Sequence, residues 1–371
     1  MSLRGALGCA LVVVLAAANV ATPLAQGIPG TRAGVAGQRG WDAISDGRNE
    51  DAAAAFADAL AVESRDPSLY LGAGVAAFRL GRTGDARRAL QQALTLAPNL
   101  TAASLILGEI YYRESELDEA LKVYEAAQKF APADKTLAAR LEKLRAESAV
   151  HRDFFQSQGS HFTILFEGPA DEAIARRALD ILEEAYFRVG TALYTFPERP
   201  ITVVLYTEQQ FRDVTRSPQW AAASYDGRIR VPMRGALEQS AELERVLAHE
   251  FTHALVQTIA PAGVPTWLNE GLAVMFEREG RSRAEDTLTR VPGRLPLQRL
   301  AGSFRQFSDA EARVAYAQSA DAVRQLFDQA GAAAVVAFLQ DLARGRRLEE
   351  AFAERMLLSY EQFAGSLSPV N

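Results

Sequence analysis

Two of the four histidines of this 371-residue chain lie four residues apart, in the segment His249-Glu250-Phe251-Thr252-His253. In an α-helix, positions i and i+4 lie on the same face, so both imidazoles can bind one metal ion. A helix with one side in the core is predicted by apolar residues at Leu243, Val246, Leu247, Ala254 and Leu255. The spacing therefore predicts a buried histidine pair of the kind that binds zinc.

Two glutamates extend this pattern. Glu250 directly follows His249, and the rotation of about 100° per residue places its carboxylate beside the metal rather than on it. A proline- and glycine-containing turn over 261–265 ends the helix, and the apolar stretch 267–276 predicts a second helix with Glu270 in its first turn. Because a buried carboxylate is costly unless paired or metal-bound, Glu270 is the expected third ligand. Two histidines, one carboxylate and an open position are typical of a catalytic zinc site.

Residues from about 151 to 330 resemble the peptidase MA-like domains, a branch of the gluzincin metallopeptidases. The motifs that carry the resemblance are H-E-F-T-H at 249–253, P-T-W-L-N-E-G-L-A at 265–273, Trp220 with Y-D-G-R-I-R-V-P at 225–232, and Y-A-Q-S at 316–319. The resemblance implies a thermolysin-like core with a small twisted sheet, the active-site helix and then the glutamate helix. The zinc ligands that it implies are His249, His253 and Glu270, and the implied general base is Glu250.

Two parts of this site stay open at the level of sequence. In thermolysin-type sequences an aspartate four residues after the third ligand orients a histidine, but Val274 occupies that position here. The group that orients the histidines is therefore unidentified. Tyr316 is a candidate catalytic residue, because a phenol can donate a hydrogen bond to the charge that develops on the substrate oxygen. Core packing is the alternative role for Tyr316.

Residues 33–132 carry an internal period of 34 residues, within a repeat domain expected over 33–149. Its members are Gly40, Gly74 and Gly108; Gly47, Gly81 and Ser115; Ala52, Ala86 and Ala120; Phe56, Leu90 and Tyr124; and Ala59, Ala93 and Ala127. This pattern resembles the tetratricopeptide repeat, in which small and large residues at these offsets let paired helices interlock. The resemblance implies an all-α solenoid that binds a protein partner, with the stretch 134–149 as a capping or linking helix. An unrelated alanine-rich helical bundle is the alternative.

The N-terminal 25 residues have the form of a signal peptide. Arg4 precedes an apolar run from Ala6 to Ala18, which is too short to span a bilayer comfortably, and cleavage is expected after Ala21 or Ala25. Lipidation at Cys9, the only cysteine, is the alternative. The expected location is therefore periplasmic or secreted, with no stable membrane span after cleavage. The net charge of −6 argues against a nucleic-acid partner.

After His151 the pattern changes to a mixture of strands and helices. Strands are expected over 161–166, 201–206 and 228–232, and helices over 170–193 and from 309 to the end. Pro232 cannot donate to a ladder, which suits an edge strand. The resemblance gives such an edge the role of pairing with an extended substrate, and an ordinary protected edge is the alternative. His151 and His161 are expected to be structural.

The sequence thus predicts an α+β protein in four parts: a signal peptide (1–25), a tetratricopeptide-like solenoid (33–149), a gluzincin-like metallopeptidase core with a small sheet (150–300), and a C-terminal helical part of the peptidase domain (301–371). The expected function is zinc-dependent hydrolysis of a peptide or protein substrate, with the repeats binding a protein. The alternative is a protein-binding scaffold whose zinc domain is inert.

Overall fold

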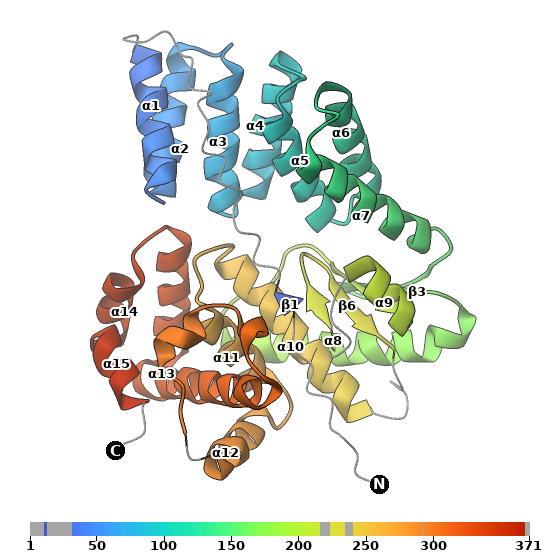
Figure 1. Cartoon of the computed structure of the whole chain (residues 1–371), viewed down its shortest axis with the longest axis vertical. Coiled ribbons are helices and arrows are strands. Elements are labelled where there is room, and N and C mark those ends of the chain that lie inside the picture. The colour runs from blue at the N-terminus through green and yellow to red at the C-terminus, as the bar shows by residue number, and fades with distance from the viewer. Residues whose placement is uncertain (1–10, 13–31, 216–222, 234–239, 292, 368–371) are drawn as a thin grey trace. The chain divides into compact units, whose positions relative to one another are not determined.

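The computed structural model describes residues 11–12, 32–215, 223–233, 240–291 and 293–367 (Figure 1). They divide into two compact units. Residues 32–152 form the repeat unit, and residues 153–342 and 347–367 belong to the sheet unit. The all-helical repeats followed by a domain with a small mixed sheet confirm the predicted α+β class.

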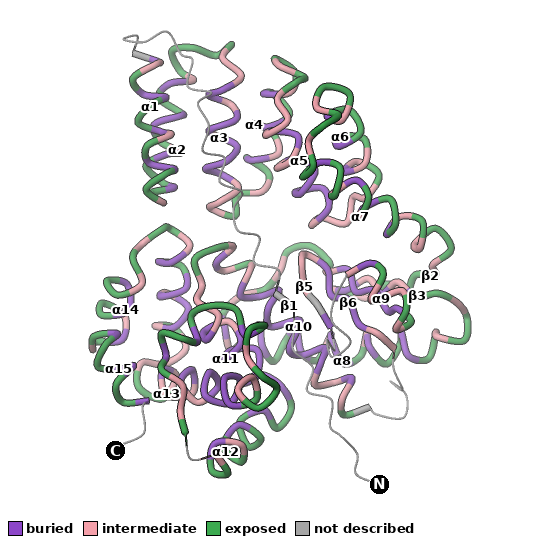
Figure 2. Tube along the Cα trace, in the orientation of Figure 1, coloured by how far each residue is buried: buried purple, intermediate pink, exposed green. Residues whose placement is uncertain are grey.

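The repeat unit is a series of helices joined by short turns. The helices are α1 (Arg32–Ser45), α2 (Asn49–Val62), α3 (Pro67–Arg79), α4 (Thr83–Leu96), α5 (Thr101–Arg113), α6 (Leu117–Phe130) and α7 (Lys135–His151). Figure 2 shows that burial is concentrated on the sides where neighbouring helices meet. Apolar side chains from all seven helices form one core. The helical pairs expected from the 34-residue period are therefore present.

The 34-residue period reflects glycines that leave room for a large side chain of a neighbouring helix. We call the space at each such glycine a socket. A Cβ atom on Gly74 would lie 2.7 Å from the Leu90 side chain, and one on Gly108 would lie 2.2 Å from the ring of Tyr124. The ring of Phe56 fills two such sockets, because Cβ atoms on Gly40 and on Gly72 of the following repeat would lie 2.7 and 2.2 Å from it. The large residue on the second helix of each repeat therefore packs where a glycine on a first helix has no side chain.

The turns between paired helices share a left-handed residue. Gly47 and Gly81 have φ values of 77° and 71°, and Ser115, at the same place in the third repeat, has φ of 64°. Glycine adopts this conformation without steric cost, whereas a residue with a Cβ atom does so at some cost. The periodic series Gly47, Gly81 and Ser115 therefore reflects one turn conformation used three times.

The sheet unit is built on a mixed sheet in the order β1-β5-β6-β4-β3-β2. Its strands are β1 (Leu11–Val12), β2 (Phe155–Gln158), β3 (Phe162–Phe166), β4 (Ile201–Tyr206), β5 (Ser224–Tyr225) and β6 (Ile229–Pro232). Strands β3, β4 and β6 are parallel to one another, β2 runs antiparallel to β3, and β5 runs antiparallel to β6. The central strand β4 is apolar apart from Thr202 and is almost completely buried, as expected for a parallel strand covered on both faces.

Two long helices, α8 (Glu172–Ala192) and α10 (Ser240–Ile259), pack against the sheet. The ring of Phe162 on β3 lies 6.2 Å from that of Tyr186 on α8 and 5.4 Å from that of Phe251 on α10, measured between centroids. The short helix η1 (Pro169–Asp171) precedes α8, and α9 (Glu208–Thr215) follows β4. This aromatic contact fixes the helix that carries the histidine pair against the sheet.

The expectation that the stretch 228–232 forms an edge strand is wrong. The strand itself is present as β6, but it lies between β4 and β5, and β5 pairs with it through Ser224–Arg230 and Tyr225–Ile229. The turn at Gly227, with φ of 103°, folds β5 back onto the outer side of β6. Strand β5 was not predicted from the sequence, because a two-residue strand has no alternating pattern.

The remaining helices follow α10 in the chain. They are α11 (Thr266–Phe276), α12 (Gly280–Arg290), η2 (Leu297–Ala301), η3 (Phe304–Gln306), α13 (Asp309–Ala343), α14 (Leu348–Met356) and α15 (Tyr360–Ser366). In the described part of the chain, α13 alone is long and apolar enough to cross a membrane by length and composition. Gly331, with φ of 78°, breaks it, and Val323 and Leu326 are completely buried. Core helices of soluble proteins meet the same criterion.

The expected signal peptide falls mostly outside the described residues. Within it the structure describes only Leu11 and Val12, which form β1 and pair in parallel with β5. The expected cleavage sites, Arg4 and Cys9 also lie outside the described residues. Export of the protein therefore stays a prediction.

The division into two units generates a first prediction. Deletion of residues 32–152 should leave a sheet unit that folds and binds zinc, because each repeat chiefly contacts its neighbours. Circular dichroism and metal analysis of the shortened and full-length proteins would measure this. If the shortened protein is insoluble or metal-free, the repeats are part of the metal-site fold.

Candidate metal centre

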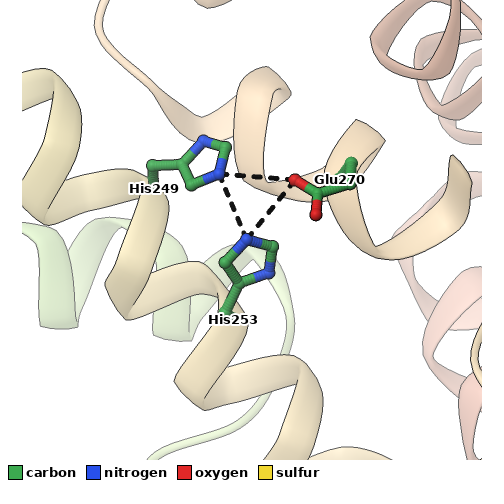
Figure 3. Close-up of side chains that lie close together, drawn as sticks. All are labelled: His249, His253 and Glu270. Atoms are coloured by element: carbon green, nitrogen blue, oxygen red, sulfur yellow. Dashed lines mark hydrogen bonds and ion pairs between the residues drawn. The ribbon is translucent and has the colours of Figure 1, made fainter. Parts of the chain in front are cut away.

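The structure brings His249, His253 and Glu270 together in the interior of the sheet unit (Figure 3). The histidines come from α10 and the glutamate from the facing helix α11. The Nε2 atoms of His249 and His253 lie 3.1 Å apart, and each lies 3.5 Å from Oε2 of Glu270. All three residues are at most 3% exposed.

These distances fit a tetrahedral zinc ion. With metal–ligand bonds of about 2.0–2.1 Å at tetrahedral angles, neighbouring ligand atoms lie about 3.3 Å apart. The three measured separations lie close to that value. Oε2 of Glu270 and Oε2 of the neighbouring Glu250 are both buried, and neither accepts a hydrogen bond in the structure. Two buried carboxylate oxygens without a donor are the groups that a metal ion and a water molecule would satisfy.

A close helix contact sets the position of Glu270. Helix α11 begins directly after Pro265 and is buried from Trp267 onwards, apart from Asn269 (Figure 2). A Cβ atom on Gly271 would lie 2.3 Å from the backbone oxygen of Ser319 on α13. The two helices therefore approach through their backbones beside Glu270, and only glycine permits this distance.

The groups that orient the two histidines are Glu277 and Asn269. Nδ1 of His249 lies 2.7 Å from Oε1 of Glu277, and Nδ1 of His253 lies 3.0 Å from Oδ1 of Asn269. Donation from Nδ1 leaves Nε2 of each ring facing the other ligands, which is the arrangement that metal-binding histidines use. Glu277 is therefore the carboxylate that orients His249, a role that Val274 cannot have. Asn269 lies inside the P-T-W-L-N-E motif, but a polar residue near a helix start carries no specific signal.

Glu277 lies where the ligand helix ends. Helix α11 stops at Phe276, whose carbonyl accepts a hydrogen bond from Arg188 of α8 (2.8 Å), and Glu277 has an extended backbone. The chain then turns through Glu279, with φ of 56°, into Gly280, where a Cβ atom would lie 1.8 Å from the carbonyl oxygen of Val274. This tight turn returns the chain over the helix end and directs Glu277 towards His249.

Burial and pairing shift the pKa values of this cluster. Burial lowers the pKa of His249, but pairing with the carboxylates of Glu270 and Glu277 outweighs burial and raises it to about 10. Burial raises the pKa of Glu270, but the positive charge of His253 and pairing with both histidines outweigh burial and lower it to about 2. For Glu250, burial raises the pKa more than the two histidines lower it. A raised pKa makes the Glu250 carboxylate a stronger proton acceptor than an exposed glutamate.

Tyr316, His151 and His161 have other neighbours. Tyr316 is a buried residue of α13, and its ring lies edge-on to that of Phe304 at 5.2 Å between centroids. Its catalytic role stays a prediction. His161 contacts Glu183 through Nδ1 at 2.6 Å and stacks on Tyr186, so it has a structural environment. His151 ends α7, with its Nε2 4.0 Å from Glu147.

The raised pKa of His249 generates a second prediction. Because its pKa is about 10, His249 is protonated at neutral pH, and a bound metal ion must displace that proton. Zinc binding should therefore release about one proton per ion, and zinc affinity should rise with pH across the neutral range. Calorimetric titration in two buffers with different ionisation enthalpies measures the release. A binding enthalpy independent of the buffer would contradict this expectation.

The contact at Gly271 generates a third prediction. Gly271→Ala should displace α11 from α13 and weaken zinc binding, since the new Cβ atom meets a backbone oxygen that cannot rotate away. Competition with a chromophoric chelator would measure the affinity. Gly365→Ala on α15 is a matched control, because a Cβ atom there meets nothing within 4 Å. Equal zinc affinity in both variants would show that the close contact does not position Glu270.

Comparisons with known proteins agree with this division. A family model of the Peptidase MA superfamily matches residues 184–360, and a tetratricopeptide repeat model matches residues 38–101 and 79–135. No protein with curated annotation matches the chain.

Two solved structures resemble the repeats. The first TPR of Spaghetti (RPAP3) bound to the HSP90 peptide SRMEEVD is 23% identical, with a TM-score of 0.31, over 32% of this chain and 96% of that chain. The NMR structure of the first TPR domain of the human RPAP3 protein is 23% identical, with a TM-score of 0.30, over 32% and 93%. From the family matches, the chain carries a Peptidase MA superfamily domain over residues 184–360, preceded by tetratricopeptide repeats.

Proposed function

We propose that the protein is a zinc-dependent metallopeptidase that hydrolyses peptide bonds. The observation that carries the proposal is the buried set His249, His253 and Glu270, with donor atoms 3.1–3.5 Å apart and Glu250 beside it. A site that only held a structural ion would need no further buried carboxylate. The match to the Peptidase MA superfamily supports the same reaction class.

The types of ligand atom indicate the metal ion and the kind of chemistry it supports. Two imidazoles and one carboxylate are the ligands of many catalytic zinc sites, and they leave one position open. When bound, a zinc ion would supply a positive centre that lowers the pKa of a water molecule and polarises a carbonyl group. His249, His253 and Glu270 would hold the ion.

Glu250 supplies the proton transfer. Its Oε2 atom is buried without a hydrogen-bond donor, so the carboxylate is free to accept a proton from the attacking water. The raised pKa makes Glu250 a better proton acceptor than an exposed glutamate, and it can return the proton to the departing amine.

The repeat unit would bind a protein, either a partner or part of a large substrate. Stacked helical repeats present an extended surface and are widely used for protein recognition. Together with the signal peptide expected over 1–25, this describes an exported peptidase, periplasmic or secreted, with a separate recognition module. Peptides too short to reach the repeats should then depend only on the sheet unit.

A contrast between two glutamates tests the proposal. Glu250→Gln keeps the shape of the side chain but removes the proton acceptor, so zinc should bind as in the wild type while peptide cleavage falls by about 10²–10⁴-fold. Glu270→Ala removes a ligand and should lose both zinc and cleavage. Metal analysis and cleavage of an unfolded protein substrate measure the two effects.

Two results would overturn the proposal. If Glu250→Gln cleaves as fast as the wild type, Glu250 is not the base. If the wild type binds zinc but cleaves no substrate while the repeats still capture a protein, the domain is an inert metal-binding part of a scaffold.

A further inference from the structure

The Glu277 carboxylate is held by two arginines as well as by His249. Its Oε1 atom lies 2.7 Å from Nδ1 of His249 and 3.4 Å from Nη1 of Arg245, and Nη2 of Arg283 donates to Oε2. The side chain of Glu277 is only 4% exposed. Three charged groups therefore converge on one buried carboxylate, and both of its oxygens have a partner.

The two arginines come from different helices and are themselves held in place. Arg245 lies one turn before His249 on α10, is 15% exposed, and also donates from Nε to Glu242 at 2.9 Å. Arg283 lies on α12 and donates from Nη1 to the backbone oxygen of Arg278 at 2.7 Å. Helices α10, α11 and α12 thus meet at the Glu277 side chain.

The position of Glu277 explains why such support is needed. A carboxylate at the position of Val274 would lie inside α11, where the helix fixes its backbone. Glu277 lies beyond the last helical residue, in a turn, and its side chain has more freedom to rotate away from His249. Two arginines restrict that freedom, because a carboxylate that leaves them would lose its charge-assisted contacts with Arg245, which is 15% exposed, and with Arg283, which is 44% exposed.

We propose that Arg245 and Arg283 are positioning residues of the metal site, which act through Glu277 to fix the orientation of the His249 ring. The arginines do not touch the metal-binding atoms. They hold the carboxylate that accepts the Nδ1 proton of His249, and so keep the Nε2 atom directed at His253 and Glu270. The inference rests on the proposed function only in taking the ion to be zinc.

Zinc affinity tests this inference, with a matched control in the same region. Arg245→Met and Arg283→Met keep much of the aliphatic length but remove the charge, and each should weaken zinc binding about tenfold, the lower end of the effect of removing a group that orients a ligand. Arg278→Met is the control. The exposed Arg278 side chain (62%) pairs instead with Glu244 on α10, at 2.7 Å. The zinc affinity of Arg278→Met should therefore stay within about twofold of the wild type.

Further measurements separate positioning from general stability. Cobalt-substituted Arg245→Met should show a shifted visible absorption spectrum if His249 is turned, and Arg245→Lys should restore part of the affinity. Zinc affinity equal to the wild type in both methionine variants would overturn the proposal. So would a weaker affinity with an unchanged cobalt spectrum and a lower unfolding temperature of the metal-free protein, which would show a structural role.

The orientation of the His249 ring can also be measured without metal or catalysis. In the metal-free protein the hydrogen-bonded Nδ1 proton of His249 should give a downfield proton signal, which its loss in His249→Ala would distinguish from that of His161, whose Nδ1 also contacts a carboxylate. That signal should weaken in Arg245→Met and Arg283→Met and persist in Arg278→Met; an equal signal in all three variants would contradict the proposal. A wild type that shows the signal but binds no zinc would refute the metallopeptidase function while leaving the positioning role intact.

Discussion

The burial of charged side chains in an apolar interior is the constraint on which the sheet unit depends. Glu250 lies on α10, Glu270 lies on α11, and Glu277 directly follows α11. None of the three is more than 7% exposed. Each buried charge needs a partner of opposite sign or a metal ion. The histidines, the arginines and the candidate ion meet that need together, so the helices that carry them are held in one arrangement.

The sheet and its helices serve this arrangement mechanically. Phe162 and Tyr186 hold α10 against the sheet through Phe251, two residues before His253. On the other side, α13 contacts α11 through backbone atoms at Gly271. Helices α10 and α11 are therefore each held by contacts on the side away from the other helix. The sides that face each other carry His249, His253 and Glu270.

The sequence predicted the parts of this structure that follow from regular periodicity. The i, i+4 pair at His249 and His253 required only a helix, and the 34-residue period of the repeats required only interlocking glycines and large residues. Glu277 was not predictable, because its position relative to Glu270 depends on where α11 ends and on the turn through Glu279 and Gly280. Strand β5 was missed because two residues cannot show a period, and that omission made β6 look like an edge.

The double role of Phe56 has a consequence for how the repeats fold. Its ring occupies the socket of Gly40 in its own repeat and that of Gly72 in the next one. The second repeat therefore finds part of its docking surface only once the first has formed. Folding free energy is then shared across the boundary rather than stored within each repeat, so the array gains cooperativity from a nearest-neighbour coupling. A local loss of order at the first repeat would accordingly be felt by the second.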